Sequence, residues 1–326
     1  MKELPFPVQE QDRCAEPPRR LTLPVAPRAN TRIRFAVIPD RAMAAISPDE
    51  AVVLVERFIS QGDQIEVVDI SGPGDPLATP HATIECLARL HRNHPELDLG
   101  IVTSGLGCAP LGESLAASGM RRVTLRVDAI TTVTAEQIYA WIRPGNRTVP
   151  LAKAADILVH EQAAAAAICT RAGIAVRIAT TVYPGFNDHE VEEIALKMAG
   201  SGAKGITLLP YLPVPGDMGC LAKPGAELMA RVAAQAARHL PVVAEAGADQ
   251  AGRCCGKTIA LSESALPKPS RQRPNVAVTS ESGMGVDQHL GQAARFLIYG
   301  PREDGLVCLL AARPAPAPGK GDARWQ

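Results

Sequence analysis

The stretch Ile65-Glu-Val-Val-Asp-Ile-Ser-Gly-Pro-Gly-Asp-Pro-Leu77 predicts a β-strand that ends in a rigid loop. Its valines and isoleucines are typical of a buried parallel strand, and the glycines and prolines that follow prevent the strand from continuing. Such a loop presents backbone N–H and C=O groups at fixed angles, where α/β proteins bind small molecules. We interpret it as a polar cradle, although an ordinary strand-to-helix turn fits these residues equally well.

Outward from this stretch, predicted strands alternate with segments of helical periodicity. The strands are predicted at 33–38, 65–70, 97–103, 123–127, 174–179 and 205–209. Helices are predicted to open at 47–50, to cover 81–93, 111–118, 134–142, 151–172 and 224–239, and to include the apolar positions of 191–198. This alternation indicates parallel βα units. Six strands cannot close an eight-stranded barrel, so we predict a partial barrel, with a doubly wound sheet as the alternative.

In either architecture the functional loops gather at the carboxyl ends of the strands. These loops are residues 71–77, 103–108, 128–132 and 180–188. Two helix starts also show cap patterns. Ser47 and Glu50 have the spacing of a capping box, and Asn187 is a predicted N-cap with Glu190 at the capping-box position.

The composition excludes several classes of partner. The chain has 326 residues, and its 34 basic residues balance 34 acidic ones, so we expect neither nucleic acid nor a membrane surface as a partner. No apolar run reaches the length of a membrane span and the N-terminus lacks the pattern of a secretory signal, so we expect a cytoplasmic protein. The eight cysteines include no CxxC pair, and we expect reduced thiols, several of them buried.

Changes in composition along the chain suggest four parts. Residues 1–31, rich in proline and charge, are predicted to form an irregular arm before a barrel at 32–255. Residues 256–274 have the composition of a linker. A small α/β unit at 275–326 is predicted to contain strands at 275–279 and 295–299 and to end in a disordered tail.

Several short segments of the chain carry a family resemblance. In the barrel they are Leu23-Pro-Val-Ala-Pro-Arg28, Gly72-Pro-Gly-Asp-Pro-Leu-Ala78, Thr103-Ser-Gly-Leu106, Val123-Thr-Leu-Arg-Val-Asp-Ala129, Ile138-Tyr-Ala-Trp-Ile-Arg143, Val182-Tyr-Pro-Gly-Phe-Asn-Asp188 and Gly247-Ala-Asp-Gln-Ala-Gly252. Their order and spacing resemble the NifB family, radical S-adenosylmethionine proteins that build the iron–sulfur core of the nitrogenase iron-molybdenum cofactor. The tail Val286-Asp-Gln-His-Leu-Gly-Gln-Ala-Ala-Arg-Phe-Leu-Ile-Tyr299 is similar to a NifX-type cofactor-carrying domain, but it is too short for a whole one.

The resemblance implies a partial barrel with S-adenosylmethionine across its strand ends. It implies that the loop formed by Gly72, Pro73, Gly74, Asp75 and Pro76 holds the methionine end of that cofactor through backbone groups. It also places Thr103, Ser104 and Asn187 near the cofactor, and it associates His289 with metal-cluster binding. Partners implied for the chain are nitrogenase cofactor maturation proteins, namely NifX-type carriers and scaffold proteins.

The chain departs from the family at the residues that hold iron. Radical chemistry of this type needs a four-iron cluster bound by three thiolates in a CxxxCxxC motif. The matching positions here are Ala29, Ile33 and Ala36, and a second family CxxC corresponds to Val243 and Ala246.

Two other sets of cysteines are possible replacements for these ligands. Cys14 is a candidate for an upstream cluster ligand of the family. The adjacent pair Cys254-Cys255 is better explained as structural thiols, because neighbouring cysteines rarely point at one metal.

Three interpretations follow from the sequence. The first is a NifB-family enzyme that assembles the carbide-containing cofactor core with [4Fe-4S] clusters and S-adenosylmethionine. The second is a degenerate, non-catalytic relative that binds S-adenosylmethionine or acts as a scaffold, because Ala, Ile and Val cannot replace thiolates. The third, least supported, is an acid–base enzyme that uses Asp75, Asp128 or His189.

Overall fold

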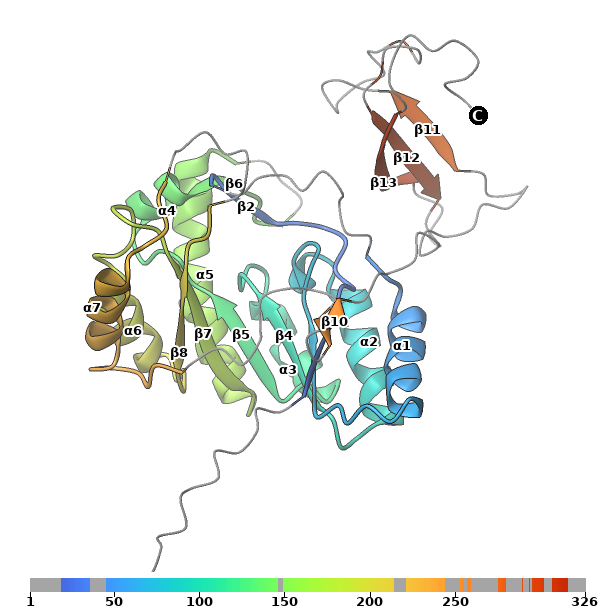
Figure 1. The fold of residues 1–326 in the computed structure, drawn as a ribbon, viewed down its shortest axis with the longest axis horizontal. Helices are drawn as coiled ribbons and strands as arrows, with labels where there is room; N and C mark the ends of the chain where they lie inside the picture. Colours follow the sequence, from blue (N-terminus) through green and yellow to red (C-terminus); the bar gives the residue numbers. More distant parts are fainter. Residues whose placement is uncertain are drawn as a thin grey trace, which may run out of the picture.

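A computed structural model describes residues 19–35, 45–145, 149–213 and 221–243 of the chain (Figure 1). In the C-terminal part it describes residues 253–254, 257–258, 275–279, 289, 293, 295–301 and 307–315.

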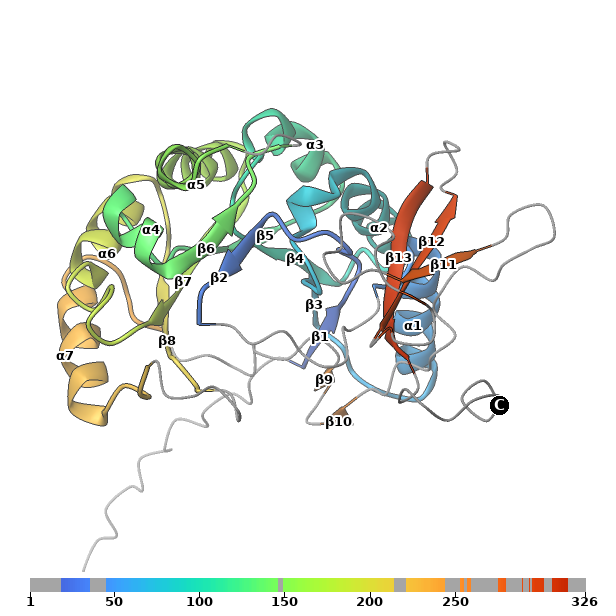
Figure 2. The ribbon, with the colours of Figure 1, turned by 90° about the horizontal axis from the view of Figure 1, so that it is seen from above.

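Six parallel strands form the main sheet, in the order β1-β3-β4-β5-β7-β8. They are β1 (Arg20–Leu23), β3 (Val67–Ile70), β4 (Asp98–Thr103), β5 (Arg122–Arg126), β7 (Ala175–Val182) and β8 (Ile206–Pro210). Each neighbouring pair is parallel, and the order across the sheet follows the chain without reversal. Figure 2 shows the strands curling into an arc. The predicted partial barrel is therefore confirmed, whereas the doubly wound alternative, which requires a reversal of strand order, is wrong.

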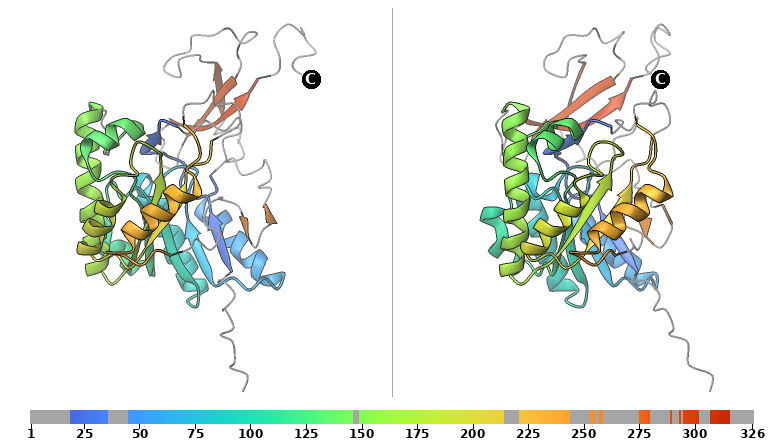
Figure 3. Two further views of the ribbon diagram at one scale, coloured as in Figure 1. Left: turned by 60° about the vertical axis from the view of Figure 1, so that its left-hand side comes forward. Right: turned by 90° about the vertical axis from the view of Figure 1, so that its left-hand side faces the viewer.

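Helices cover the outer side of this arc (Figures 2 and 3). They are α1 (Pro48–Ser60), α2 (Pro80–Asn93), α3 (Gly112–Ala117), α4 (Thr132–Ile138), α5 (Leu151–Arg171), α6 (Val191–Gly200) and α7 (Ala226–Ala236). Two short 3-10 helices, η1 (Pro76–Ala78) and η2 (Ala109–Leu111), follow β3 and β4. Among the described helices, none is long and apolar enough to cross a membrane.

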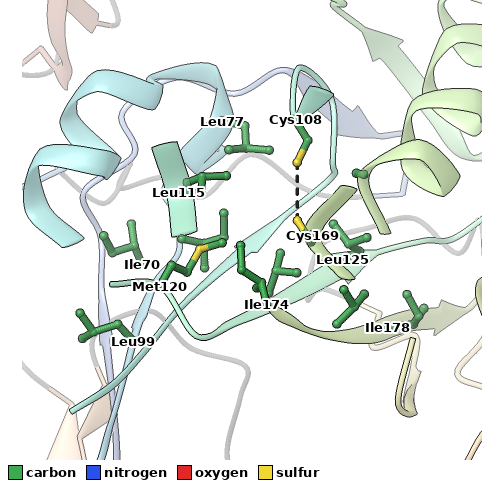
Figure 4. Packing of buried hydrophobic residues seen from close by; sticks show 14 of the residues in the cluster. Ile70, Leu77, Leu99, Cys108, Leu115, Met120, Leu125, Cys169, Ile174 and Ile178 are labelled. Atoms are coloured by element: carbon green, nitrogen blue, oxygen red, sulfur yellow. Dashed lines mark hydrogen bonds between the residues drawn. The ribbon is translucent and has the colours of Figure 1, made fainter. Parts of the chain in front are cut away.

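The main core lies between the sheet and these helices. Alternate strand residues such as Ile70, Leu99, Leu125 and Ile178 are fully buried there, as Figure 4 shows. Because side chains alternate across a strand, the intervening residues project to the concave inner face of the arc. The alternation of residues along each strand therefore gives the sheet an apolar face toward the helices, and the other half of the strand side chains line the inside of the half-barrel.

The first strand of the sheet lies earlier in the chain than predicted. Leu21 and Leu23 of β1 are fully buried in the core, and β1 pairs with β3. The predicted first strand at 33–38 is wrong in its described part, because Thr31–Ile33 form the short strand β2, which pairs antiparallel with β6 (Tyr139–Ile142). Residues 36–38 lie outside the described residues. The sheet consequently begins within the segment that we predicted to be an irregular arm.

The helix caps agree with the sequence at one site and differ at another. The Ser47 hydroxyl accepts from the Glu50 N–H at 3.2 Å and the Glu50 carboxylate accepts from the Ser47 N–H at 2.8 Å, so the predicted capping box is confirmed. Asn187 is not the N-cap of α6, which begins after Glu190. Helix α4 also ends at Ile138, and the residues that we predicted to continue it form β6.

The C-terminal part contains a separate antiparallel sheet. Its strands are β11 (Val276–Thr279), β12 (Arg295–Pro301) and β13 (Val307–Pro314), in the order β11-β12-β13. The predicted strands at 275–279 and 295–299 are confirmed by β11 and β12. Earlier in the chain, two strands of two residues each, β9 (Arg253–Cys254) and β10 (Lys257–Thr258), pair in an antiparallel manner. The described part of this region contains no helix, so the α/β character that we predicted for it stays a prediction.

Candidate functional site

The predicted cradle and the end of the neighbouring strand meet through one buried carboxylate. Asp75 follows β3, and one of its oxygens accepts from the Leu77 N–H at 2.9 Å and from the Thr103 hydroxyl at 2.7 Å. Its other oxygen accepts from the Ser104 N–H at 2.6 Å. Asp75 is only 4% exposed, and charge-assisted hydrogen bonds of this kind are strong in a buried setting. Three predicted site positions therefore form one connected unit.

The cradle is also held by the chain segment that follows β1. The N–H groups of Gly74 and Asp75 donate to the carbonyls of Ala26 and Arg28 at 2.6 and 2.8 Å, and the Ala26 N–H donates to the Gly72 carbonyl at 3.0 Å. A Cβ at Gly74 would lie 2.1 Å from the Arg28 oxygen. Glycine at position 74 is therefore required by the approach of the protein's own backbone.

Two residues of the cradle, the exposed Pro73 and the buried Gly74, carry carbonyl oxygens that have no donor among the described residues. Because the nearby N–H groups are already used, the cradle can offer acceptors but few donors. Such a surface suits an ammonium group better than an anion.

Asn30 joins this unit, although our sequence interpretation did not single it out. The Ser104 hydroxyl donates to the Asn30 side-chain oxygen at 3.2 Å, and both residues are buried. Asn30 immediately follows Ala29, one of the positions where the resemblance implies a thiolate. A single asparagine belongs to no motif, so the only sequence signal for Asn30 is its place beside a cluster-ligand position of the resembling family.

Asn187 lies in a second unit, at the ends of β5 and β7. Its side-chain oxygen accepts from the Tyr183 N–H at 2.8 Å, and its amide donates to the carbonyls of Asp128 and Thr181 at 2.8 and 2.7 Å. The side chain is fully buried and these bonds use both of its donors. Asn187 therefore holds the loop after β7 in place.

Asp128 is the most perturbed carboxyl at this edge of the sheet. Burial raises its pKa to about 6, against the lowering effects of the Thr181 N–H, which donates to it at 2.8 Å, and of Arg126. Glu190, also buried, accepts from the Ile130 N–H at 2.9 Å and fixes the loop after β5. A carboxyl with a pKa near 6 can exchange protons near neutral pH.

An apolar cluster lies beside these loops. Phe35 is buried, and its ring centroid lies 4.8 Å from that of Phe186, 5.4 Å from that of Tyr183 and 6.1 Å from that of Tyr211. Ile33 packs against the same cluster from β2. The segment that the resemblance assigns to a cluster-binding loop is therefore partly used for aromatic packing.

Comparison with known proteins identifies the family. The FeMo cofactor biosynthesis protein NifB of Chlorobaculum tepidum is 33% identical over 328 residues, which cover 94% of this chain and 77% of that protein. The chain belongs to the NifB family. The FeMo cofactor biosynthesis protein NifB of Klebsiella pneumoniae is 26% identical over 332 residues, which cover 88% of this chain and 71% of that protein.

The remaining comparisons concern the fold. The crystal structure of SuiB from Streptococcus suis matches with a TM-score of 0.53 and 15% identity, over 70% of this chain and 49% of that chain. At this identity the likeness shows the fold alone. No family model matches the chain. Together with this likeness, the curled sheet of six parallel strands establishes a partial (βα)6 barrel.

The residues of this NifB-family chain do not fit a family iron–sulfur cluster. Ala29 is exposed, Ile33 is half-buried in β2, and Val243 lies beside β8, where its N–H donates to the Ile206 carbonyl at 2.9 Å. None of these side chains can bind iron. In the described ranges, no three His, Cys, Asp or Glu side chains are grouped so that they could hold a metal ion. Ala36, Ala246 and Cys14 lie outside the described residues.

The other candidate residues are spread over the molecule. His289 is exposed in the C-terminal part, and its carbonyl accepts from the Ala293 N–H at 3.1 Å. His189 is exposed next to the buried Glu190. Cys86, Cys108 and Cys169 are free and buried, as expected for structural thiols. The metal-binding role of His289 stays a prediction.

Proposed function

We propose that this chain serves FeMo cofactor biosynthesis as an S-adenosylmethionine-binding scaffold protein of the NifB family that does not itself cleave the cofactor. The observation that carries the proposal is a contrast within one site. The cradle, Asp75 and the end of β4 form an intact hydrogen-bonded unit, whereas Ala29 and Ile33 stand where thiolates would be needed.

The cradle supports binding of the amino end of S-adenosylmethionine. The carbonyl oxygens of Pro73 and Gly74 would accept hydrogen bonds from its ammonium group. Asp75, Thr103 and Ser104 would act indirectly, since their hydrogen bonds fix the loop that carries those carbonyls. When bound, S-adenosylmethionine supplies a sulfonium centre joined to an adenosyl group. Asn187 would hold the neighbouring loop close to the bound cofactor.

The packing around these positions also argues against a bound cluster. Ile33 lies in a strand paired with β6, and the following aromatic residue, Phe35, is buried in the second core cluster. A cluster there would have to displace packed apolar side chains as well as find new ligands. We therefore derive no cluster-dependent step for this chain.

A second candidate function is the assembly reaction of the family itself, with iron ligands supplied by another protein. The observation in its favour is the similarity to the Chlorobaculum tepidum NifB across 94% of this chain. Under either candidate, the expected partners are nitrogenase cofactor maturation proteins, including NifX-type carriers and scaffold proteins. We place both functions in the cytoplasm.

Calorimetric titration of the full chain with S-adenosylmethionine tests the proposal. We expect saturable binding by the wild-type chain and its loss in Gly74→Ala, because the added Cβ would lie 2.1 Å from the Arg28 oxygen and displace the cradle. Gly200→Ala is the matched control, since a Cβ there meets nothing within 4 Å. Should Gly74→Ala fail to fold, Thr103→Val provides the test, because it removes the hydroxyl that donates to Asp75 and should weaken binding. No binding by a folded wild-type chain would overturn the proposal.

A further inference from the structure

The inner face of the half-barrel carries arginines in its middle strands. In β5, Val123 and Leu125 point into the helix-side core, so Arg126 projects to the inner face. In β7, Val176 and Ile178 point into the same core, so Arg177 projects inward by the same rule.

Arginines nearer the amino ends of the strands are already paired. Asp69 is 2% exposed and lies between Arg20, at 3.1 Å, and Arg122, at 2.9 Å. Arg122 also donates to Asp98 at 2.8 Å. Two arginines therefore balance two aspartates, and this part of the inner face carries no surplus charge.

Arg126 and Arg177 differ from Arg20 and Arg122 because no carboxylate is paired with them among the described residues. Both are exposed, and within the part of the chain that the structure describes, neither guanidinium makes a hydrogen bond or an ion pair. The register pairs Arg177 with Thr124 and Arg126 with Ala179. The two arginines therefore occupy opposite corners of one patch, and the small side chains of Thr124 and Ala179 lie at the other two corners.

Few charges face this patch. Asp128 is the carboxyl whose charge interacts with Arg126, but it is buried and already accepts the Thr181 N–H at 2.8 Å. Burial also raises the pKa of Asp128 to about 6, which weakens its negative charge below that pH. Arg177 interacts with Arg20, a like charge, which itself lies beside Asp69. Counting only the residues that the structure describes, the patch therefore carries a surplus of positive charge.

We propose that the inner face between β5 and β7 binds an oxyanion, a phosphate or carboxylate group, through Arg126 and Arg177. Guanidinium groups present several N–H donors in a plane and bind such groups in a bidentate manner. A concave surface also concentrates the field of its charges. This inference goes beyond the proposed function, because it names a second class of ligand that needs neither a cluster nor S-adenosylmethionine.

Titration calorimetry of the full chain in chloride buffer tests the site, with inorganic phosphate as one probe and malonate as the other. We expect saturable binding of at least one probe, and the tighter one identifies the preferred group. Arg126→Gln and Arg177→Gln should each weaken binding about tenfold or more, and the double variant should abolish it. The control is Arg171→Gln, an exposed arginine in the last turn of α5.

The outcomes separate this inference from the proposed function. Absence of saturable binding of both probes, or binding that survives in the double variant, would overturn the anion site. Because both arginines are exposed, the variants should keep the wild-type unfolding temperature, which we would verify for each. S-Adenosylmethionine binding is measured in the same samples. If the wild-type chain binds phosphate or malonate but not S-adenosylmethionine, the proposed function fails and the anion site stands.

Discussion

The Thr103 hydroxyl donates to the Asp75 carboxylate across 2.7 Å and so joins the end of β4 to the loop after β3. The same carboxylate accepts from the Ser104 N–H. The position of the cradle loop after β3 relative to the end of β4 therefore depends on one buried residue, Asp75. Loss of that carboxylate would affect both at once.

Asp75→Ala should lower the free energy of unfolding by about 3 kcal/mol, because it leaves a buried hydroxyl and two buried N–H groups without their acceptor. Urea denaturation measures this change. The control is Asp156→Ala, an exposed acid on α5, which should cost less than about 0.5 kcal/mol. Equal effects of the two substitutions would show that Asp75 does not organise the loops.

Asn187→Ala should also be strongly destabilising, by about 3 kcal/mol, because the Tyr183 N–H and two carbonyls would lose their partner. Asn93→Ala removes one exposed side-chain contact, to Glu56, and should have little effect. Thermal unfolding of the two variants compares them. A small effect at Asn187 would be evidence against its positioning role.

Asp128 should make stability depend on pH. Because burial raises its pKa from 3.8 to about 6, the folded state holds a proton that the unfolded state has released between these values. The stability of the wild-type chain relative to Asp128→Asn should therefore fall as pH rises from about 4 to about 6, by about 3 kcal/mol in total. Urea denaturation of both proteins across this range provides the difference. A difference that stays flat or rises with pH would contradict the assignment.

The buried thiols should resist alkylation. Burial raises the pKa of Cys86 to about 12, and the sulfurs of Cys108 and Cys169 lie 3.7 Å apart in the core shown in Figure 4. Because all three side chains are buried and out of reach of the reagent, peptides containing these cysteines should stay unlabelled by iodoacetamide in the native chain and be labelled in urea. Rapid labelling of the native chain would mean that the core opens readily.

Local patterns in the sequence predicted much of the half-barrel. The β-branched residues of β3 and the glycines and prolines after them were sufficient to locate the cradle. The capping box of Ser47 and Glu50 was also predictable, because all of its atoms lie within one turn. Contacts between residues that are far apart in the sequence could not be predicted in this way. β1 is a four-residue strand within a charged, proline-rich segment, and only its pairing with β3 identifies it.

The candidate site shows the same division. Gly74 belongs to the loop that the sequence marks as a cradle, but the close approach of Arg28 to its Cα depends on a segment that lies more than forty residues earlier. Asn187 has the sequence of an N-cap, yet its amide bonds the backbone of two strand ends instead. The inner-face arginines carry no motif. Their significance depends on register and on which side of the sheet is covered by helices.

Iron and sulfide counting after anaerobic reconstitution tests the central claim most directly, since it asks whether this chain binds a cluster without the family thiolates. Samples are measured with and without S-adenosylmethionine by ultraviolet-visible and electron paramagnetic resonance spectroscopy. We predict no stoichiometric cluster, alongside calorimetric binding of S-adenosylmethionine. About four irons per chain, with a spectrum that S-adenosylmethionine perturbs, would contradict the account and assign the radical reaction to this protein.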